Sequence, residues 1–290
     1  MGRIKVKTKT MMPQKLQWST CNPGLLIILV DQTNTASFVG VPDIANALIE
    51  AIIMLCFAGE KPKNRSYISI IGYNNEVRLL QSGDLQYFES NPVRVEEGVI
   101  KKLPDGAGGL VEIKCKRPIW IQKELPNSAG RNMYGAFDLS NELIKEWVDQ
   151  YPERPAPIIL NISAGLPYDT SSDCTESMLK VADVVESIKT LSTITSNEKI
   201  QIINVLVDYS LNKYIFPLKN SSFTPEQDFF YEISTELHDI QGIYNAAEYQ
   251  QLVLDGGSRS FIYNMGKDDV RRLVGCLFAS AWLRSRRWEI

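Results

Sequence analysis

Continuous apolar runs of β-strand length recur along the chain and constrain its fold more than any other feature. None of them alternates apolar with polar residues, which favours strands that are covered on both faces, as in a parallel sheet. The runs are GLLIILV (24–30), YISIIGY (67–73), APIILNIS (156–163), IQIINVLV (200–207) and SFIYNM (260–265).

Segments with helical periodicity lie between these runs. Apolar residues recur at spacings of three and four in 43–57, 133–151, 176–191 and 268–283, as expected for helices that bury one face. Strands that alternate with helices of this length predict βαβ units. We therefore expect an α/β fold with a doubly wound, mostly parallel, Rossmann-like sheet flanked by helices.

The stretch 76–122 has a different pattern. Apolar and polar residues alternate in EVRLL, VRVEE and LVEIKCKRPIWI, and the turn-forming segments QSGD, NP and PDGAGG separate them. This pattern predicts an antiparallel β insertion in the α/β frame. The expected organisation is a basic N-terminal extension (1–22), a single domain (23–283) that contains the insertion (76–122), and a basic C-terminal tail (284–290).

Charge and cysteine usage narrow the class of protein. The net charge of −3 over 290 residues gives no general electrostatic reason to bind nucleic acid or an anionic membrane. The five cysteines are far apart and form no CxxC pair, which argues against a disulfide framework and a cysteine zinc site. We expect a soluble protein in a reducing compartment, most simply the cytoplasm, with neither nucleic acid nor a membrane as its partner.

Polar residues directly after the first apolar run form the strongest candidate site. In LLIILVDQTNTAS (25–37), Asp31 follows the run, and Thr33 and Thr35 come at alternate positions after it. Carboxylate and hydroxyl oxygens are ligands that suit Mg²⁺. The same side chains can instead hydrogen-bond to the backbone of their own loop. From these residues alone both interpretations stay open.

The ordered set of motifs resembles the von Willebrand factor A domain family, in its bacterial intracellular branch. The matching segments are VDQTNTAS, SAGRNMYGAFDLSNELIKEWVDQYP and PIILNISAGLP, with further similarity in RPIWI, IINVLVDY and SFIYNMGKDDVRRLV. The resemblance implies a metal-ion-dependent adhesion site at the carboxyl ends of the strands. In that site a Mg²⁺ ion takes a carboxylate from a partner protein.

Two of the three loops of that site depart from the family pattern. Asp31, Thr33 and Thr35 match the first loop, but Asn132 stands where the family has Thr in the second loop. In the third loop Ser163 and Ala164 stand where the family has Thr-Asp, and Ala164 has no ligand atom. We therefore expect a degenerate site with a single carboxylate. The candidate Mg²⁺ ligands are Asp31, Thr33, Thr35 and Asn132; the candidate partner-binding residues of the same loops are Gln32, Asn34, Arg131, Ser163 and Asp169.

The only histidine, His238, lies in STELHDI, away from every loop of this site. Ser-His-Asp, Cys-His and multi-histidine metal arrangements need a histidine beside a nucleophile or metal. The sequence therefore predicts a protein that is not an enzyme.

The leading hypothesis is a non-catalytic protein–protein interaction module with no certain cofactor. It would act as an adaptor, scaffold or regulatory subunit of a bacterial multi-protein system, through the loops at the C-terminal ends of the sheet. The first alternative is a Mg²⁺-dependent module that captures a partner carboxylate. The second is a subunit that contributes to an enzymatic complex.

Overall fold

The computed structural model describes residues 18–58, 60–104, 109–122, 130–169, 173–194, 197–236, 257–267, 269–270 and 273–274. The strands are β1 (Gly24–Asp31), β2 (Phe57–Ala58), β3 (Lys61–Pro62), β4 (Ser66–Tyr73), β5 (Val77–Asp84), β6 (Arg94–Pro104), β7 (Leu110–Ile119), β8 (Ile158–Ser163), β9 (Gln201–Leu206), β10 (Tyr214–Ile215) and β11 (Phe261–Tyr263). The helices are α1 (Asn34–Val39), α2 (Val41–Cys56), α3 (Leu85–Ser90), α4 (Met133–Gln150), α5 (Cys174–Thr190) and α6 (Pro225–Glu232).

Seven of the described strands form one mixed sheet in the order β10-β11-β9-β8-β1-β4-β5. The five inner strands are parallel to one another, whereas β5 and β10 pair antiparallel at the two edges. From β1 the chain adds strands in both directions, which is the doubly wound arrangement. The predicted fold class is confirmed.

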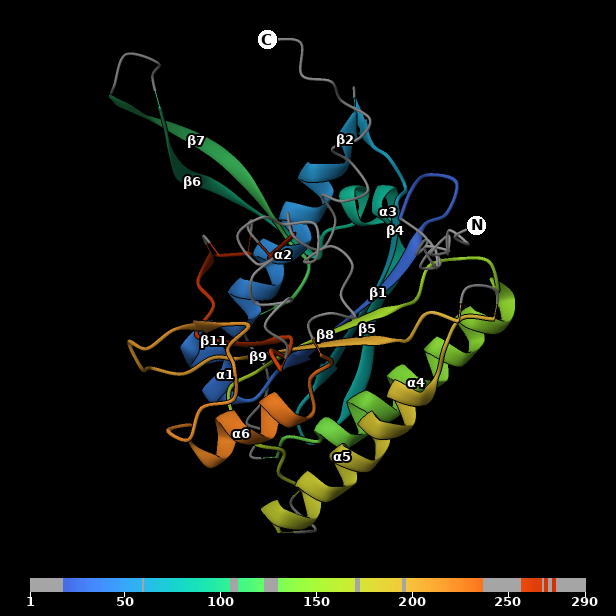
Figure 1. The fold of residues 1–290 in the computed structure, drawn as a ribbon. Helices are drawn as coiled ribbons and strands as arrows, with labels where there is room; N and C mark the ends of the chain where they lie inside the picture. The colour runs from blue at the N-terminus through green and yellow to red at the C-terminus, as the bar shows by residue number, and fades with distance from the viewer. Residues whose placement is uncertain are drawn as a thin grey trace, which may run out of the picture.

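Strand β1 is buried over its whole length because helices cover both faces of the sheet. Its even-numbered side chains from Leu26 to Val30 belong to the apolar cluster that contains α2. The odd-numbered ones from Leu25 to Leu29 belong to the cluster that contains α4, α5 and α6. Figure 1 shows α2 on one side of the sheet and α4 and α5 on the other. Burial on both faces explains why the run is continuously apolar.

Three of the four predicted helices are present as α2, α4 and α5. Most of the fourth, 268–283, lies outside the described residues. His238, residues 1–17 of the N-terminal extension and the tail 284–290 also lie outside them. Trp18 lies within them: it is buried and packs over Gly24 at the start of β1.

The first part of the 76–122 stretch extends the main sheet. Strand β5 pairs antiparallel with β4. The predicted turn QSGD is not a turn, because residues 81–84 complete β5. Asp84 then caps α3, since its Oδ1 accepts a hydrogen bond from the backbone N–H of Tyr87 at 2.8 Å. This is the usual role of an aspartate at a helix start.

The antiparallel insertion itself consists of β6 and β7, which pair with each other in a separate ribbon. The ribbon projects from the body in Figure 1. At its base Asn46 of α2 accepts hydrogen bonds from the backbone N–H groups of Trp120 (2.8 Å) and Ile121 (3.0 Å). Its Nδ2 also donates to Ile121 O at 2.8 Å. The buried amide therefore fixes the ribbon to the domain.

Within the described part of the chain, no helix has both the length and the apolar character needed to cross a membrane.

Candidate functional site: the loops at the carboxyl ends of the parallel strands

The loops that follow β1 and β8 meet at one edge of the sheet, where α4 also begins. In open α/β sheets this edge is the usual place for a binding site. The geometry there is organised around the carboxylate of Asp31, which is completely buried.

Both carboxylate oxygens of Asp31 are saturated with hydrogen bonds. Oδ1 accepts from the backbone N–H of Thr33 at 2.9 Å and from its hydroxyl at 2.8 Å. Oδ2 accepts from Nε of Arg131 at 2.6 Å and from the backbone N–H of Ala164 at 3.0 Å. Ser163 Oγ lies 3.1 Å from the same oxygen and 3.0 Å from Gly165 O, and its single hydrogen serves one of them at a time. A carboxylate offers about four lone-pair positions, and four donors are present without Ser163.

Arg131 lies between all three loops. Besides the ion pair with Asp31, its Nη1 donates to Leu166 O at 2.9 Å and its Nη2 to Thr33 Oγ1 at 3.3 Å. Its backbone pairs with Tyr168 in the third loop, through Arg131 N to Tyr168 O (2.6 Å) and Tyr168 N to Arg131 O (3.1 Å). The guanidinium thus joins loops from distant parts of the sequence at one buried carboxylate.

The hydroxyl of Thr33 is used in full. It donates to Asp31, accepts from Arg131, and accepts from the backbone N–H of Ala36 at 3.3 Å, so that Thr33 caps α1. Thr35 lies on α1 and is exposed.

Asn132 caps α4, because its Oδ1 accepts from the backbone N–H of Gly135 at 2.9 Å. In this structure the predicted ligand oxygen of Asn132 is thus engaged at the start of α4.

These residues do not fit the Mg²⁺ ion that the resemblance implies. The oxygens of Asp31 and Thr33 already hold as many hydrogen bonds as their lone pairs allow. Asn132 is occupied as a cap. Among the described residues, moreover, no three His, Cys, Asp or Glu side chains gather into a group that could hold a metal ion.

The candidate partner-binding residues divide by exposure. Asn34 is exposed and Asp169 is partly exposed. Gln32 and Ser163 are buried, and Gln32 Oε1 packs so closely over Gly72 that a Cβ there would clash. In this structure the side chains of Gln32 and Ser163 therefore lie below the molecular surface. Arg131 has a side chain only 14% exposed and serves the internal ion pair.

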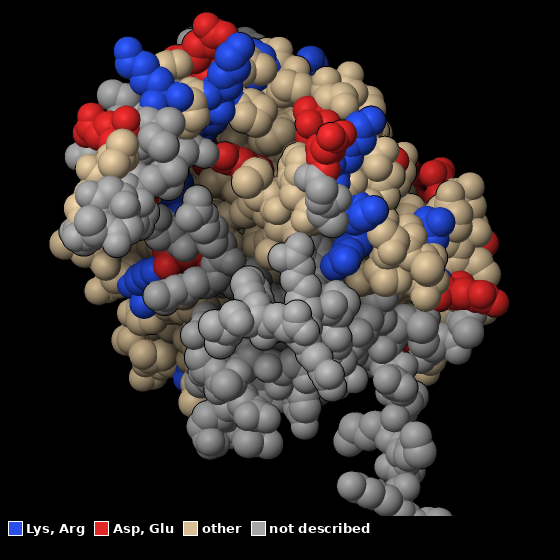
Figure 2. All heavy atoms as spheres, turned by 90° about the horizontal axis from the view of Figure 1, so that it is seen from above, with Lys and Arg blue, Asp and Glu red and all other residues tan. Residues whose placement is uncertain are grey.

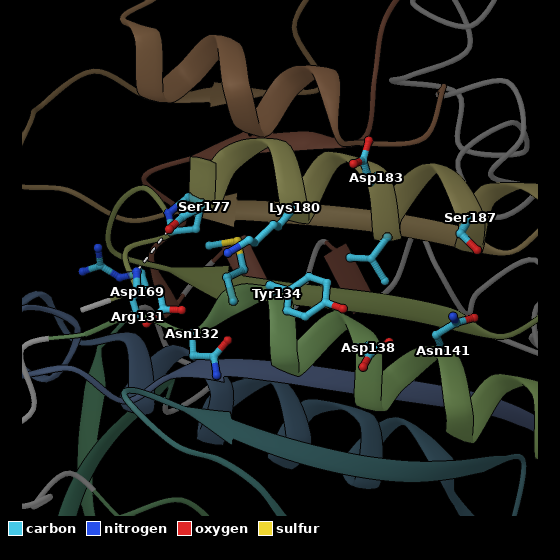
Figure 3. A pocket seen from close by; sticks show the side chains of 13 residues that line it. Arg131, Asn132, Tyr134, Asp138, Asn141, Asp169, Ser177, Lys180, Asp183 and Ser187 are labelled. Carbon is cyan, nitrogen blue, oxygen red and sulfur yellow. Dashed lines mark hydrogen bonds between the residues drawn. The ribbon is translucent and has the colours of Figure 1, made fainter. Parts of the chain in front are cut away.

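A groove of about 720 Å³ continues from Arg131 along the space between α4 and α5. Figure 3 shows its labelled side chains, which come from these two helices and the loops before them. Charges of both signs line it: Arg131 and Lys180 on one hand, Asp138, Asp169 and Asp183 on the other. The buried Asn141 lies against it, and its Oδ1 has no hydrogen-bond partner within the described structure.

A chain of buried hydrogen bonds runs across the sheet behind the site. The hydroxyl of Tyr73 donates to Asn161 Oδ1 (2.9 Å), and Asn161 Nδ2 donates to Asn204 Oδ1 (3.0 Å). Asn204 Nδ2 donates to Ser234 Oγ at 2.9 Å. Burial, with a smaller contribution from the charge of Asp31, raises the pKa of Tyr73 well above its usual value. The phenol therefore stays protonated and acts as a donor.

Apolar side chains stand exposed on the same edge. Phe38 of α1 is 79% exposed and Tyr209, after β9, is 61% exposed. Their rings contact edge to face with centroids 5.4 Å apart. Leu211 is fully exposed in the same loop as Tyr209. We call Phe38, Tyr209 and Leu211 the apolar patch.

The loop that carries Tyr209 and Leu211 is held in place by Asn264, which follows β11. Its Oδ1 accepts from the backbone N–H of Asp208 at 2.6 Å, and its Nδ2 donates to Ser210 O (2.8 Å) and Asn212 O (2.9 Å). Asn264 has the left-handed backbone conformation (φ 56°) that Asn tolerates better than most residues. The apolar patch is therefore preorganised.

Two features were missed from the sequence. Arg131 was predicted to contact a partner, and in the structure it forms an ion pair with Asp31. The sequence did contain a signal for this pair: Arg131 is a cation in a loop of a site that has only one carboxylate. The apolar patch had a weaker signal: Phe38 directly follows the segment NTAS, and Tyr209 and Leu211 alternate with polar residues in DYSLN.

The charged side chains do not form a large patch of one sign on the described face. In the described part of the face seen in Figure 2, acidic and basic side chains are interspersed. This agrees with the small net charge.

No protein-family model and no curated protein sequence matches the chain. Solved structures do match. A von Willebrand factor type A protein from Catenulispora acidiphila has 9% identity and a TM-score of 0.43, covering 90% of this chain and 43% of that one. The pilus adhesin SpaC from Lactobacillus rhamnosus GG has 8% identity and a TM-score of 0.46, covering 92% and 31%. The ArnB paralog VWA2 from Sulfolobus acidocaldarius has 11% identity and a TM-score of 0.34, covering 63% and 34%.

The chain thus spans less than half the length of these three proteins. With TM-scores below 0.5 and identities of 8–11%, these matches carry no functional argument.

Proposed function

We propose that the chain is a non-catalytic module that binds another protein through the loops at the carboxyl edge of its sheet. The observation that carries this proposal is the apolar patch. Large exposed apolar side chains in contact with one another mark interaction surfaces more often than scattered ones do. Aromatic residues also supply much of the binding energy at such surfaces.

Preorganisation adds to this support. Ordering a loop on binding costs free energy, so a loop that is already held retains more of the contact energy as affinity. Asn264 holds the backbone of residues 208–212 before any partner arrives. The ring of Phe38 likewise rests against Tyr209.

The proposal includes a biological setting: an adaptor, scaffold or regulatory subunit of a bacterial multi-protein system in the cytoplasm. Its support is the motif resemblance to the bacterial intracellular branch of the family. The unpaired thiols of Cys21, Cys56 and Cys174 suit a reducing compartment.

Photo-crosslinking in the native cells tests the surface. A photoreactive amino acid at Leu211 is expected to give one discrete crosslinked protein. The same amino acid at Met54 is the matched control, since Met54 is 64% exposed but lies in the last turn of α2, away from the loop edge. An identical product from both positions would contradict a specific partner at this edge.

Substitution then tests the energetics. Phe38→Ser and Tyr209→Ser are each expected to weaken binding of the crosslinked protein by roughly tenfold or more, as at an interface hot spot. Met54→Ser is expected to leave the affinity unchanged. If neither loop substitution changes the Kd, the partner does not use the apolar patch.

A further inference from the structure

Arg131 does structurally what a bound ion would do at this site. A cation at the meeting point of the loops would neutralise Asp31 and tie the loops together. The guanidinium does both: Nε contacts Asp31 Oδ2 at 2.6 Å, Nη2 contacts Thr33 Oγ1 at 3.3 Å, and Nη1 contacts Leu166 O at 2.9 Å. First and third loops are thereby joined through a residue of the second.

The third loop is shaped to admit this side chain. A Cβ on Gly165 would lie 2.9 Å from Arg131 Nη1, so any larger residue would push the guanidinium away. Gly165 also has a φ of 154°, which glycine adopts more readily than other residues. The paired backbone hydrogen bonds between Arg131 and Tyr168 fix the base of the side chain on the same loop.

A divalent ion and this guanidinium compete for the same atoms. The ion would need lone pairs of Asp31 and Thr33 that already accept hydrogen bonds. It would also meet the positive charge of Arg131 directly across the carboxylate, where like charges repel. A site of this geometry holds one cation or the other.

We infer that Arg131 is a covalently attached replacement for the metal ion, which makes the loop edge a metal-independent structure. This deepens the proposed function, because partner binding then requires no Mg²⁺. It rests on the Asp31–Arg131 pair and not on the apolar patch. Metal measurements and partner measurements can therefore fail separately.

Mn²⁺ binding and thermal unfolding of the full chain test the inference. In millimolar Mn²⁺, electron paramagnetic resonance is expected to show no stoichiometric binding of Mn²⁺ to the wild-type protein. Its Tm should be the same in EDTA and in millimolar Mg²⁺. Arg131→Ser frees lone pairs on Asp31 and Thr33 and is expected to lower the Tm in EDTA. Added Mg²⁺ or Mn²⁺ should then raise the Tm, with Mn²⁺ affinity at least roughly tenfold above wild type.

Two matched variants assign the effect. Arg154→Ser makes the same change at an arginine that stacks on Tyr151, and it is expected to respond to metal like wild type. The double variant Asp31→Asn/Arg131→Ser lacks the carboxylate and is expected to lose the metal response of Arg131→Ser.

Stoichiometric Mn²⁺ binding by wild type that Asp31→Asn abolishes would overturn the inference. So would a folded Arg131→Ser that responds to metal no more than Arg154→Ser. If Arg131→Ser folds in neither buffer, wild type decides: one bound Mn²⁺ overturns the inference, and its absence supports it. Partner affinity in EDTA is a separate readout and should equal that in Mg²⁺.

Discussion

At the scale of single residues, burial decides the chemistry of Cys56. Its thiol lies in the cluster that packs α2 on the sheet. Burial raises its pKa from 9.0 to about 12, against a smaller lowering by Arg65. The reactive thiolate of Cys56 is therefore scarce at neutral pH.

We predict that Cys56 resists alkylation in the native protein at pH 8 while Cys21 reacts, and that both react in denaturant. Peptide mapping by mass spectrometry measures the two rates. The raised pKa also means that the folded state holds this proton more tightly than the unfolded chain. The corresponding contribution to stability is full below about pH 9 and is lost as the pH rises toward 12. Equal native rates at Cys56 and Cys21 would contradict the burial.

The loop site shows what a local sequence can and cannot predict. Thr33 stands two residues after Asp31, so a tight loop with mutual hydrogen bonds follows from spacing alone. Arg131 lies 100 residues further along. No local rule links it to Asp31, because their contact depends on how three loops converge after the sheet has formed. The hydrogen-bonded loop was thus predictable from the local sequence, whereas the contact of Arg131 with Asp31 was not.

At the scale of elements, the polar chain from Tyr73 to Ser234 connects strands that are otherwise held by apolar packing. Tyr73 lies on β4, Asn161 on β8 and Asn204 on β9. Ser234 ends the chain by donating to Phe230 O in α6 at 2.6 Å. Each buried amide needs its neighbour as a partner, so this set fixes how β4, β8, β9 and α6 lie together.

Tyr73→Phe removes one hydroxyl from this chain and keeps the ring. We predict a loss of about 1–3 kcal/mol in the free energy of unfolding, because Asn161 Oδ1 is left buried without its donor. Tyr87→Phe is the matched control, since Tyr87 is 41% exposed, and its cost should be near zero. Urea unfolding measures both. Equal losses in the two variants would mean that the hydrogen-bond chain adds nothing to stability.

Periodicity predicted the strands and long helices well because the spacing of apolar residues within each segment determines which face is buried. It did not predict which sheet β5 joins. Alternation indicated an antiparallel strand, but the pairing of Ile70 with Gln81 and of Ser69 with Ser82 depends on a partner that the pattern does not name. Asp84 was misread for a related reason: a helix cap and a turn favour the same residue types.

At the scale of the whole molecule, the β6–β7 ribbon is separate from the apolar core, which consists of one cluster on each face of the main sheet. Its strands pack mainly against each other. It is anchored at its base by Asn46 and by the ion pair of Arg117 with Asp43 at 3.4 Å. The core on both sides of β1 is complete without the outer ribbon. The ribbon should therefore be separable from the fold.

Glu96 and Arg117 pair directly across the ribbon, so an Asn-Gly turn can join them in place of residues 97–116, as a two-residue hairpin loop. We predict that this shortened chain unfolds cooperatively, with a free energy of unfolding within about 1 kcal/mol of the full chain, because the apolar core is unchanged. Circular dichroism during urea unfolding measures it. Asn46→Ala should cost more, about 1–3 kcal/mol, since it leaves backbone groups of Trp120 and Ile121 buried without their partner.

The same shortened chain separates two places where a partner could bind. If the apolar patch carries recognition, the crosslinked protein binds the shortened chain with unchanged Kd and binds Tyr209→Ser weakly. If the ribbon carries recognition, the crosslinked protein binds the shortened chain weakly and binds Tyr209→Ser with unchanged Kd. A shortened chain that loses several kcal/mol of stability would instead show that the ribbon belongs to the fold. The ribbon would then contribute to the stability of the domain although it projects from it.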